Sequence, residues 1–100
     1  MSRTLRNLRA AREELAAAVQ WFEEQRVGLG AEFYEEVTAT IARLQALPDS
    51  GLPISADHLT RRLLVPRFPY QIVYRLTPIE IVVLAVAHLK RRPNYWTKRK

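Results

Sequence analysis

Apolar residues follow one another almost without a break from Ile79 to Ala87, where only Glu80 is polar. The run is short and rich in Ile and Val, which favours a β-strand over the competing helix. A strand that is apolar on both sides is covered on both faces of its sheet. The pattern therefore predicts a central strand over residues 79–88, which brings His88 to one rim of the sheet.

A helical period precedes this strand, in residues 10–25 and again in residues 31–47. The predicted buried faces contain Ala11, Leu15, Ala18, Val19, Trp21 and Phe22 in the first stretch and Phe33, Val37, Ile41 and Leu44 in the second. Gly28 and Gly30 lie between the stretches and provide a helix cap and a tight reversal. A loop this short predicts an antiparallel helical hairpin, with Trp21 and Phe22 in the core.

Further strands are predicted on either side of the hairpin. A weak alternation in residues 3–8 indicates either a short first strand or a disordered terminus. After a loop over 51–58, residues 60–65 form a strand that ends near Pro66, and residues 70–76 alternate. The alternation places Tyr70, Ile72, Tyr74 and Leu76 on one face and Gln71, Val73 and Arg75 on the other. Because the connections between the last three strands are short, they form an antiparallel meander.

These elements predict an α+β fold in the order β-α-α-β-β-β, with the helical hairpin packed on one face of a small antiparallel sheet. Residues 1–100 form a single domain, with the hairpin at about 10–47, the strand meander at about 60–88 and a basic tail at 89–100. A chain of 100 residues with 48% hydrophobic content supports one core without a metal or a disulfide.

Composition excludes several classes of protein. The chain contains no cysteine, so neither a disulfide framework nor a thiolate metal site is available. No apolar segment reaches the roughly 18 residues of a membrane span. The arginine-containing N-terminus lacks the apolar stretch of a secretory signal. We therefore expect a cytoplasmic protein.

The charge is distributed unevenly along the chain. Residues 1–50 contain six Arg and eight acidic residues, a net charge of −2, whereas residues 51–100 contain ten Lys or Arg and two acidic residues, a net charge of +8. A basic half of this kind favours a polyanionic partner, either nucleic acid or an acidic protein segment. A solubilising surface is the alternative.

Several familiar signals of catalysis are missing. The GLG sequence at the helix junction is a cap and not a phosphate-binding loop. The two histidines, His58 and His88, are isolated from other metal ligands, so neither a metal nor a cofactor is expected. A triad can be written from Ser55, Asp57 and His88, but nothing in the sequence brings these residues together.

A group of cations with one His and one Tyr remains near the end of the predicted sheet. Guanidinium groups hold phosphates and stabilise developing negative charge, and a His or Tyr beside them acts as a general acid. With attack by the substrate's own 2′-OH, these groups are the minimum equipment of a metal-free ribonuclease, in which the general base is less obvious. The predicted catalytic residues are Arg62, Arg67, Arg75, His88 and Tyr95, and the predicted RNA-binding residues are Arg61, Lys90, Arg91 and Arg92.

The ribonuclease interpretation requires these side chains to meet. In an antiparallel meander, Arg61 or Arg62, Arg67, Arg75 and His88 are expected on the exposed side of the sheet, with Tyr95 following directly. His88 is also the best candidate for a general base, because the basic half contains only two acids. Structural alternatives exist: Arg75 as a solvated residue, His88 as a polar strand end, and Tyr95 packed with its neighbour over the sheet edge.

Four stretches carry a resemblance to a known family: AREELAAAVQWFEEQRVGLGAEFYEEV, LPDSG, RRLLVPRFPYQIVYRL and IVVLAVAHLKRRPNYW. The specific part is FPY-x-IVY, followed by a strand that ends in AVAH and by RRP-x-YW. In these stretches the chain resembles the RelE/ParE superfamily of toxins from bacterial type II toxin-antitoxin systems, often called plasmid-stabilisation proteins. The resemblance implies a β-α-α-β-β-β fold, the same order that the hydrophobic pattern predicts.

The resemblance also implies a function and partners. Some members cut mRNA in the ribosomal A site, and others poison DNA gyrase without being nucleases. By position, the matches to the cutting type are Arg62, Arg67, Arg75, His88, Arg91 and Tyr95. The first hypothesis is therefore a toxin that acts as a ribosome-dependent mRNA endoribonuclease. The alternatives are a gyrase inhibitor and a non-toxic antitoxin-binding homologue. The implied partners are a cognate antitoxin that covers the hairpin and the basic rim, and either the ribosome with mRNA or DNA gyrase.

Overall fold

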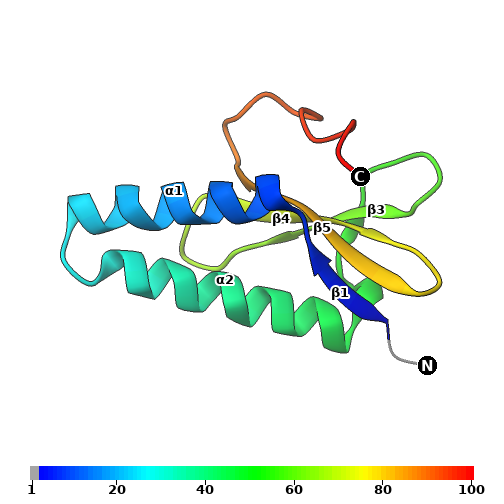
Figure 1. The fold of residues 1–100 in the computed structure, drawn as a ribbon, viewed down its shortest axis with the longest axis horizontal. Helices are drawn as coiled ribbons and strands as arrows, with labels where there is room; N and C mark the ends of the chain where they lie inside the picture. The colour runs from blue at the N-terminus through cyan, green and yellow to red at the C-terminus, as the bar shows by residue number, and fades with distance from the viewer. Residues whose placement is uncertain (1–2) are drawn as a thin grey trace.

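In the computed structural model, which describes residues 3–100, two helices pack on one face of a five-stranded sheet (Figure 1). The helices are α1 (Arg9–Gln25) and α2 (Leu29–Ala46), and a short 3-10 turn, η1 (Pro48–Ser50), follows them. The strands are β1 (Thr4–Asn7), β2 (Leu52–Pro53), β3 (Thr60–Leu64), β4 (Tyr70–Leu76) and β5 (Glu80–His88). The predicted α+β class, hairpin and strand meander are confirmed. Neither helix in residues 3–100 has the length and apolar character to span a membrane.

The sheet is mixed, with strand order β1-β5-β4-β3-β2. Strands β3, β4 and β5 form the expected antiparallel meander. Strand β1, however, pairs in parallel with β5, so the expectation of a wholly antiparallel sheet is wrong at this edge. A parallel pair needs a long connection, and the hairpin together with the meander provides it. The stretch 52–53, expected to be a loop, pairs with β3 as the opposite edge strand.

A β-bulge in the central strand changes which side chains share a face. Val73 pairs with Ala85, and Tyr74 pairs with Val83, so Leu84 has no partner in β4. Because of the extra residue, Leu84 and Ala85 both face away from the helices, where they pack with Val73. After the bulge, the side chains of β5 again alternate between the two faces of the sheet, but the pattern is shifted by one residue.

Aromatic rings fill the space between the hairpin and the sheet. The ring centroids of Phe22 and Phe33 lie 4.8 Å apart, and Phe68 and Tyr70 pack on both. Trp21, predicted to be in the core beside Phe22, is 54% exposed, so that prediction is wrong. One residue corresponds to about 100° around a helix, which takes Trp21 to the edge of the apolar stripe. Its ring packs against that of Phe22 in a T-shaped arrangement, with the two centroids 5.1 Å apart.

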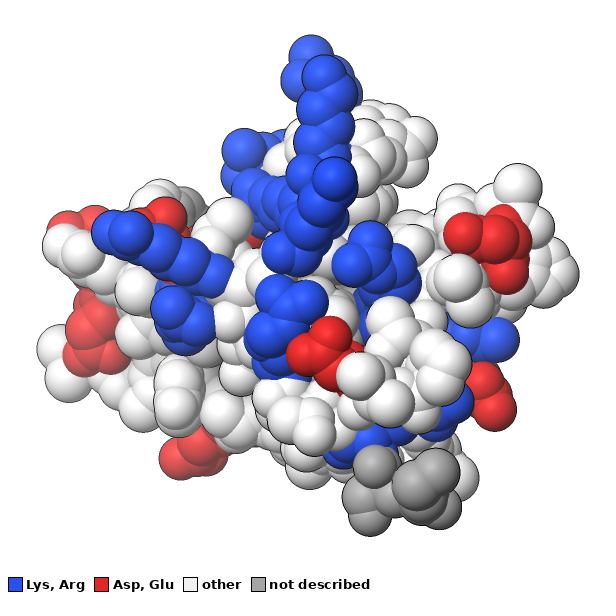
Figure 2. Space-filling view, turned by 45° about the vertical axis from the view of Figure 1, so that its right-hand side comes forward, with Lys and Arg blue, Asp and Glu red and all other residues white. Residues whose placement is uncertain are grey.

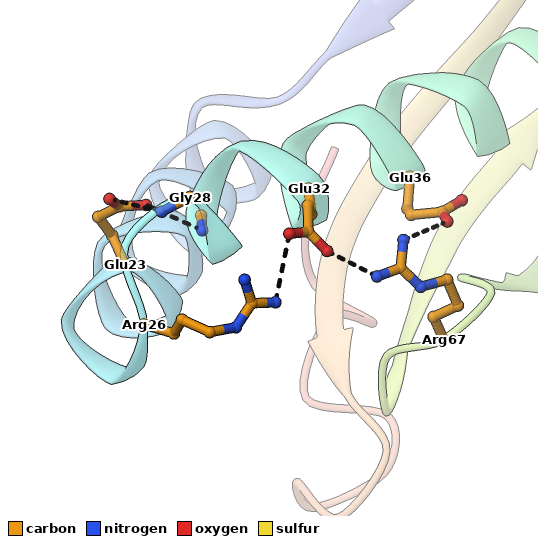
Figure 3. A network of polar contacts seen from close by, with 7 residues as sticks. Glu23, Arg26, Gly28, Glu32, Glu36 and Arg67 are labelled. Atoms are coloured by element: carbon orange, nitrogen blue, oxygen red, sulfur yellow. Dashed lines mark hydrogen bonds and ion pairs between the residues drawn. The ribbon is translucent and has the colours of Figure 1, made fainter.

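Polar contacts and a close approach of the two helices fix the tip of the hairpin (Figure 3). The carboxylate of Glu23 accepts hydrogen bonds from the backbone N–H groups of Gly28 and Gly30, at 3.0 to 3.1 Å. A carboxylate there satisfies donors at the start of α2 and interacts favourably with the helix dipole. A Cβ atom on Gly30 would lie 2.6 Å from the carbonyl oxygen of Val19, so only glycine permits this approach.

The C-terminal segment, residues 89–100, covers part of the other sheet face (Figure 1, orange to red). Trp96 is only 5% exposed and packs against a second apolar cluster that includes Val73, Val82 and Ala87. Packing of Trp96 over the sheet, one of the alternatives drawn from the sequence, is therefore confirmed. Both faces of β5 are covered, in agreement with its apolar sequence.

Candidate functional site

Lys and Arg side chains gather over the C-terminal segment and the adjoining sheet (Figure 2). The segment contributes Lys90, Arg91, Arg92, Lys98, Arg99 and Lys100. The side chains predicted to form one site lie in three different places. Some contact a carboxylate on α1, some lie on the sheet face beside the C-terminal segment, and some contact the hairpin.

The first surrounding is a network around Glu14 of α1, whose side chain is 13% exposed. Its Oε1 accepts hydrogen bonds from the backbone N–H of Val86 at 3.0 Å and from Arg99 at 2.9 Å. Its Oε2 accepts hydrogen bonds from the hydroxyl of Tyr95 at 2.8 Å, from Arg99 at 3.2 Å and from Arg91 at 3.3 Å. We call this set the Glu14 network. One carboxylate on α1 thereby holds three side chains of the C-terminal segment.

The Glu14 network also satisfies backbone groups along the free edge of β5. Strand β1 pairs with only the first residues of β5, so within residues 3–100 the remainder of β5 has no neighbouring strand on that side. The N–H of Val86 donates to Glu14, and the carbonyl oxygen of Leu84 accepts a hydrogen bond from Arg99 at 2.9 Å. Two side chains thus satisfy backbone groups that a strand would otherwise pair.

Tyr95 is strongly affected by this environment. Burial raises the pKa of Tyr95 well above its ordinary value, and the hydrogen bond to the carboxylate of Glu14 raises it further. The guanidinium of Arg91 lies 3.9 Å from the centre of the Tyr95 ring, a cation–π contact. A general acid works best with a pKa near the working pH. The arrangement therefore suits Tyr95 for structural support better than for proton transfer.

His88 lies on the hairpin side of the sheet. It pairs with Tyr70 across β4 and β5, and the two ring centroids are 5.1 Å apart. Its Nδ1 accepts a hydrogen bond from the backbone N–H of Lys90 at 3.0 Å, which leaves the proton of the neutral ring on Nε2. With Trp21 and Arg91, His88 lines a shallow hollow of about 280 Å³.

Arg62 and Arg75 lie on the opposite face, beside the C-terminal segment. Arg75 pairs with Val82 and Arg62 pairs with Val73, and both valines belong to the apolar cluster under the segment. The expectation that His88 shares the exposed face with these arginines is therefore wrong. The alternation of β5, restarted at its bulge, turns His88 to the other side of the sheet.

Arg67 and Arg61 are held by the hairpin and its following turn. Arg67, in the β3–β4 turn with a φ of 71°, contacts Glu32 at 2.7 Å and Glu36 at 3.3 Å on α2 (Figure 3). The hydrogen bond from Arg67 lowers the pKa of Glu32 below its ordinary value. Arg61 donates a hydrogen bond to the carbonyl oxygen of Gly51 at 2.9 Å. The expected place of Arg67 on the exposed sheet face is therefore wrong, and of the two alternatives Arg61 and Arg62 it is Arg62 that lies on that face.

Two members of the Glu14 network are not among the residues predicted from the sequence. The sequence pattern gives Glu14 no role, and it places Arg99 only within the basic tail at 89–100. The two contacting residues are 85 positions apart in the sequence, so no local pattern connects them. Lys90 and Arg92, predicted to bind RNA, are exposed. Among residues 3–100, no three His, Cys, Asp or Glu side chains are grouped in a way that could hold a metal ion.

A helical hairpin on a small mixed sheet, followed by a basic segment, agrees with the fold that the resemblance to the RelE/ParE superfamily implies. The family described as "ParE toxin of type II toxin-antitoxin system, parDE" matches residues 5–93. The chain therefore belongs to the ParE toxin family. A solved structure from the chromosomal ParDE toxin-antitoxin system of P. aeruginosa has a TM-score of 0.78 and 19% sequence identity. The match covers 88% of this chain and 97% of that chain, and at this identity the likeness concerns the fold. No curated protein matches the sequence.

Proposed function

We propose that this ParE-family toxin inhibits growth in the cytoplasm by binding DNA gyrase, and that it does not cut RNA. The observation that carries the proposal is the separation of the residues that RNA cleavage would require. A metal-free ribonuclease needs an acid, a base and cations within hydrogen-bond reach of one phosphate. Here His88 and Arg75 belong to opposite faces of the sheet, and the hydroxyl of Tyr95 donates to Glu14.

The hairpin and the C-terminal segment provide a binding surface that suits this proposal. Trp21 is 54% exposed on α1, and Val27 at the hairpin tip is 87% exposed. The contacts of Glu23 hold the tip in one conformation, so little ordering of the backbone is needed on binding. Exposed Trp residues are frequent hot spots of protein interfaces.

A cognate antitoxin is the partner that the family implies, and we propose that it covers the hairpin and the basic C-terminal segment. The segment and the sheet beside it are basic, which favours an acidic or amphipathic antitoxin segment. Such a segment, ordered only on binding, would neutralise the surface that gives the toxin its activity.

The ribosome-dependent endoribonuclease remains the second candidate, for one reason. Arg62 and Arg75 lie on the same sheet face, and neither forms an ion pair within residues 3–100. Two such guanidinium groups are suited to phosphates. This candidate requires a base and an acid to be supplied at that face.

Two assays with the purified toxin, freed of antitoxin, separate the candidates. We expect inhibition of DNA supercoiling by gyrase, and intact mRNA ends in a cell-free translation reaction mapped by primer extension. The variant Trp21→Ala should weaken inhibition of gyrase at least about tenfold, as for an interface hot spot. The matched variant His88→Ala should retain it. Discrete cuts in mRNA that require ribosomes would overturn the proposal, and harmless expression without any antitoxin would indicate a homologue that has lost toxicity.

A further inference from the structure

Within residues 3–100, Arg75 is the one arginine of the sheet strands whose side chain forms neither an ion pair nor a hydrogen bond, because Arg62 donates a hydrogen bond to Gln71 at 3.3 Å. Arg6, Arg61 and Arg67 each form an ion pair. None of the ion pairs among residues 3–100 includes Arg75, and its guanidinium donates no hydrogen bond within that range. Arg75 is nevertheless only partly exposed to solvent. A cation that has lost part of its hydration and has no partner favours an anionic ligand.

Arg75 lines a hollow of about 230 Å³ between the sheet and the C-terminal segment, which we call the Arg75 pocket. Its apolar walls come from Ile54 and Leu84. The volume is suited to a small anion or to the end of a larger molecule. The residues that line the pocket come from β3, β4 and β5, from the loop before β3 and from the C-terminal segment.

The polar groups of the pocket are suited to donate hydrogen bonds. Thr60 comes from β3, and Asn94 and Thr97 come from the C-terminal segment. Their side chains form no hydrogen bond with any residue in the described range 3–100, so their hydroxyl and amide groups are available. These donors and Arg75 belong to three separate parts of the chain and surround one space. A tetrahedral anion, with acceptor oxygens on every side, uses such a set more fully than a planar carboxylate does.

The acidic groups near the pocket are already engaged. Arg99 at its edge contacts Glu14 at 2.9 Å. Asp57 accepts hydrogen bonds from the hydroxyl of Ser55 and from the backbone N–H of Leu59. Ser55 therefore has no proton to offer a ligand, although it lines the pocket. Asp57 itself is exposed, so water screens its charge, and the unpaired guanidinium determines the sign of the field inside.

We propose that the Arg75 pocket binds a phosphate group, with Arg75 as its charged donor and Thr60, Asn94 and Thr97 as neutral donors. The bound phosphate connects strands β3 and β4 to the C-terminal segment. It provides a second attachment of that segment to the domain, separate from the Glu14 network. Inorganic phosphate and a phosphate monoester share this chemistry. The site does not depend on which target the toxin inhibits.

The test is a titration of the whole chain, followed by the NMR signals of the Arg75 Nε–H and the Trp96 indole N–H. Inorganic phosphate should produce saturable shifts, with a Kd at least about tenfold lower than that of acetate at the same ionic strength. Adenosine 5′-monophosphate in place of phosphate distinguishes the two sources. Equal binding assigns the site to phosphate esters as well, and failure to bind restricts it to the free ion.

Variants separate the pocket from the general basic surface. Arg75→Gln should abolish the saturable shift of Trp96, and Arg75→Lys should weaken phosphate binding about tenfold, because an ammonium group lacks the guanidinium fork. Thr97→Val, on the exposed segment, should weaken binding several-fold. Arg92→Gln, which removes an exposed charge outside the pocket, is the control and should change the Kd less than about twofold. Equal shifts with chloride, equal affinity for acetate, or unchanged binding by the Arg75→Gln protein would overturn the proposal.

Discussion

Replacement of Glu14 by Ala measures how strongly one carboxylate holds the C-terminal segment on the domain. The substitution removes the acceptor of hydrogen bonds from Val86, Arg91, Tyr95 and Arg99. The backbone N–H of Val86 is the most costly loss, because a buried donor without a partner destabilises by about 1–3 kcal/mol. The side chains of Arg99 and Arg91 are 21% and 54% exposed, so water partly replaces the carboxylate for both. Each lost ion pair therefore contributes roughly 1 kcal/mol or less.

Together these losses predict that Glu14→Ala lowers the free energy of unfolding by about 3–4 kcal/mol. That is a large part of the roughly 5–15 kcal/mol that stabilises a typical domain. Glu14→Gln keeps an oxygen acceptor for Val86 but loses the charge, so a smaller loss of about 1–2 kcal/mol is expected. Because the segment would detach more often, trypsin should cleave at its lysines and arginines several-fold faster in the Ala variant.

The adjacent residue gives a matched control. Glu13 lies one position earlier on α1 and is 66% exposed in its side chain, and within residues 3–100 its one ion pair is with Arg9 at i,i+4. Glu13→Ala removes the same carboxylate from the same helix, and should change the free energy of unfolding by less than about 0.5 kcal/mol. Urea unfolding followed by circular dichroism and by tryptophan fluorescence measures all three variants. If Glu14→Ala were as stable as Glu13→Ala, the Glu14 network would not be what holds the segment.

Three further predictions concern other contacts. Gly30→Ala should lower the free energy of unfolding by about 1–3 kcal/mol in urea, because a Cβ atom would lie 2.6 Å from a carbonyl oxygen of α1; an unchanged midpoint would mean that the helices separate easily. Burial raises the pKa of Tyr95, so above about pH 10 the unfolded chain loses this proton first and stability falls. Tyr95→Phe should show a shallower decline in urea unfolding between about pH 9 and 11.5, and parallel declines would contradict the reasoning. Arg67→Gln should raise the pKa of Glu32 toward its ordinary value in an NMR titration, since the hydrogen bond from Arg67 is the largest cause lowering it.

The hydrophobic pattern predicted those parts of the fold in which burial follows a regular period. The central strand, the hairpin and the alternation of residues 70–76 depend on such periods, and the structure has all three. Strand β1 has only four residues, and its partner is the last strand of the chain, so neither its length nor its direction of pairing is visible locally. The prediction that Trp21 is buried is wrong because the helical period of the sequence does not show where the apolar face of the helix ends.

The candidate site is harder to predict, because the positions of its side chains depend on which sheet face each residue occupies and on the conformation of the turns. The bulge at Leu84 determines the face of His88, and no composition signal marks the bulge. The turn around Arg67 directs that side chain to two glutamates of α2. The contact of Glu14 with Tyr95 joins residues 81 positions apart. A count of cations along a sequence therefore identifies a basic surface, but it does not decide which cations are paired.

The parallel pairing of β1 with β5 has a consequence for the synthesis of the toxin. Thr4 pairs with Glu80, and Leu5 pairs with Ile81, so β1 cannot form its parallel pairing until the ribosome has made residues 80–83. The hairpin emerges early, but the strand on which it packs most extensively is the last to be translated. Its apolar face remains open to proteases and chaperones during that interval. A nascent chain interrupted before residue 80 therefore lacks β5, the strand on which α1 packs and with which β1 and β4 pair.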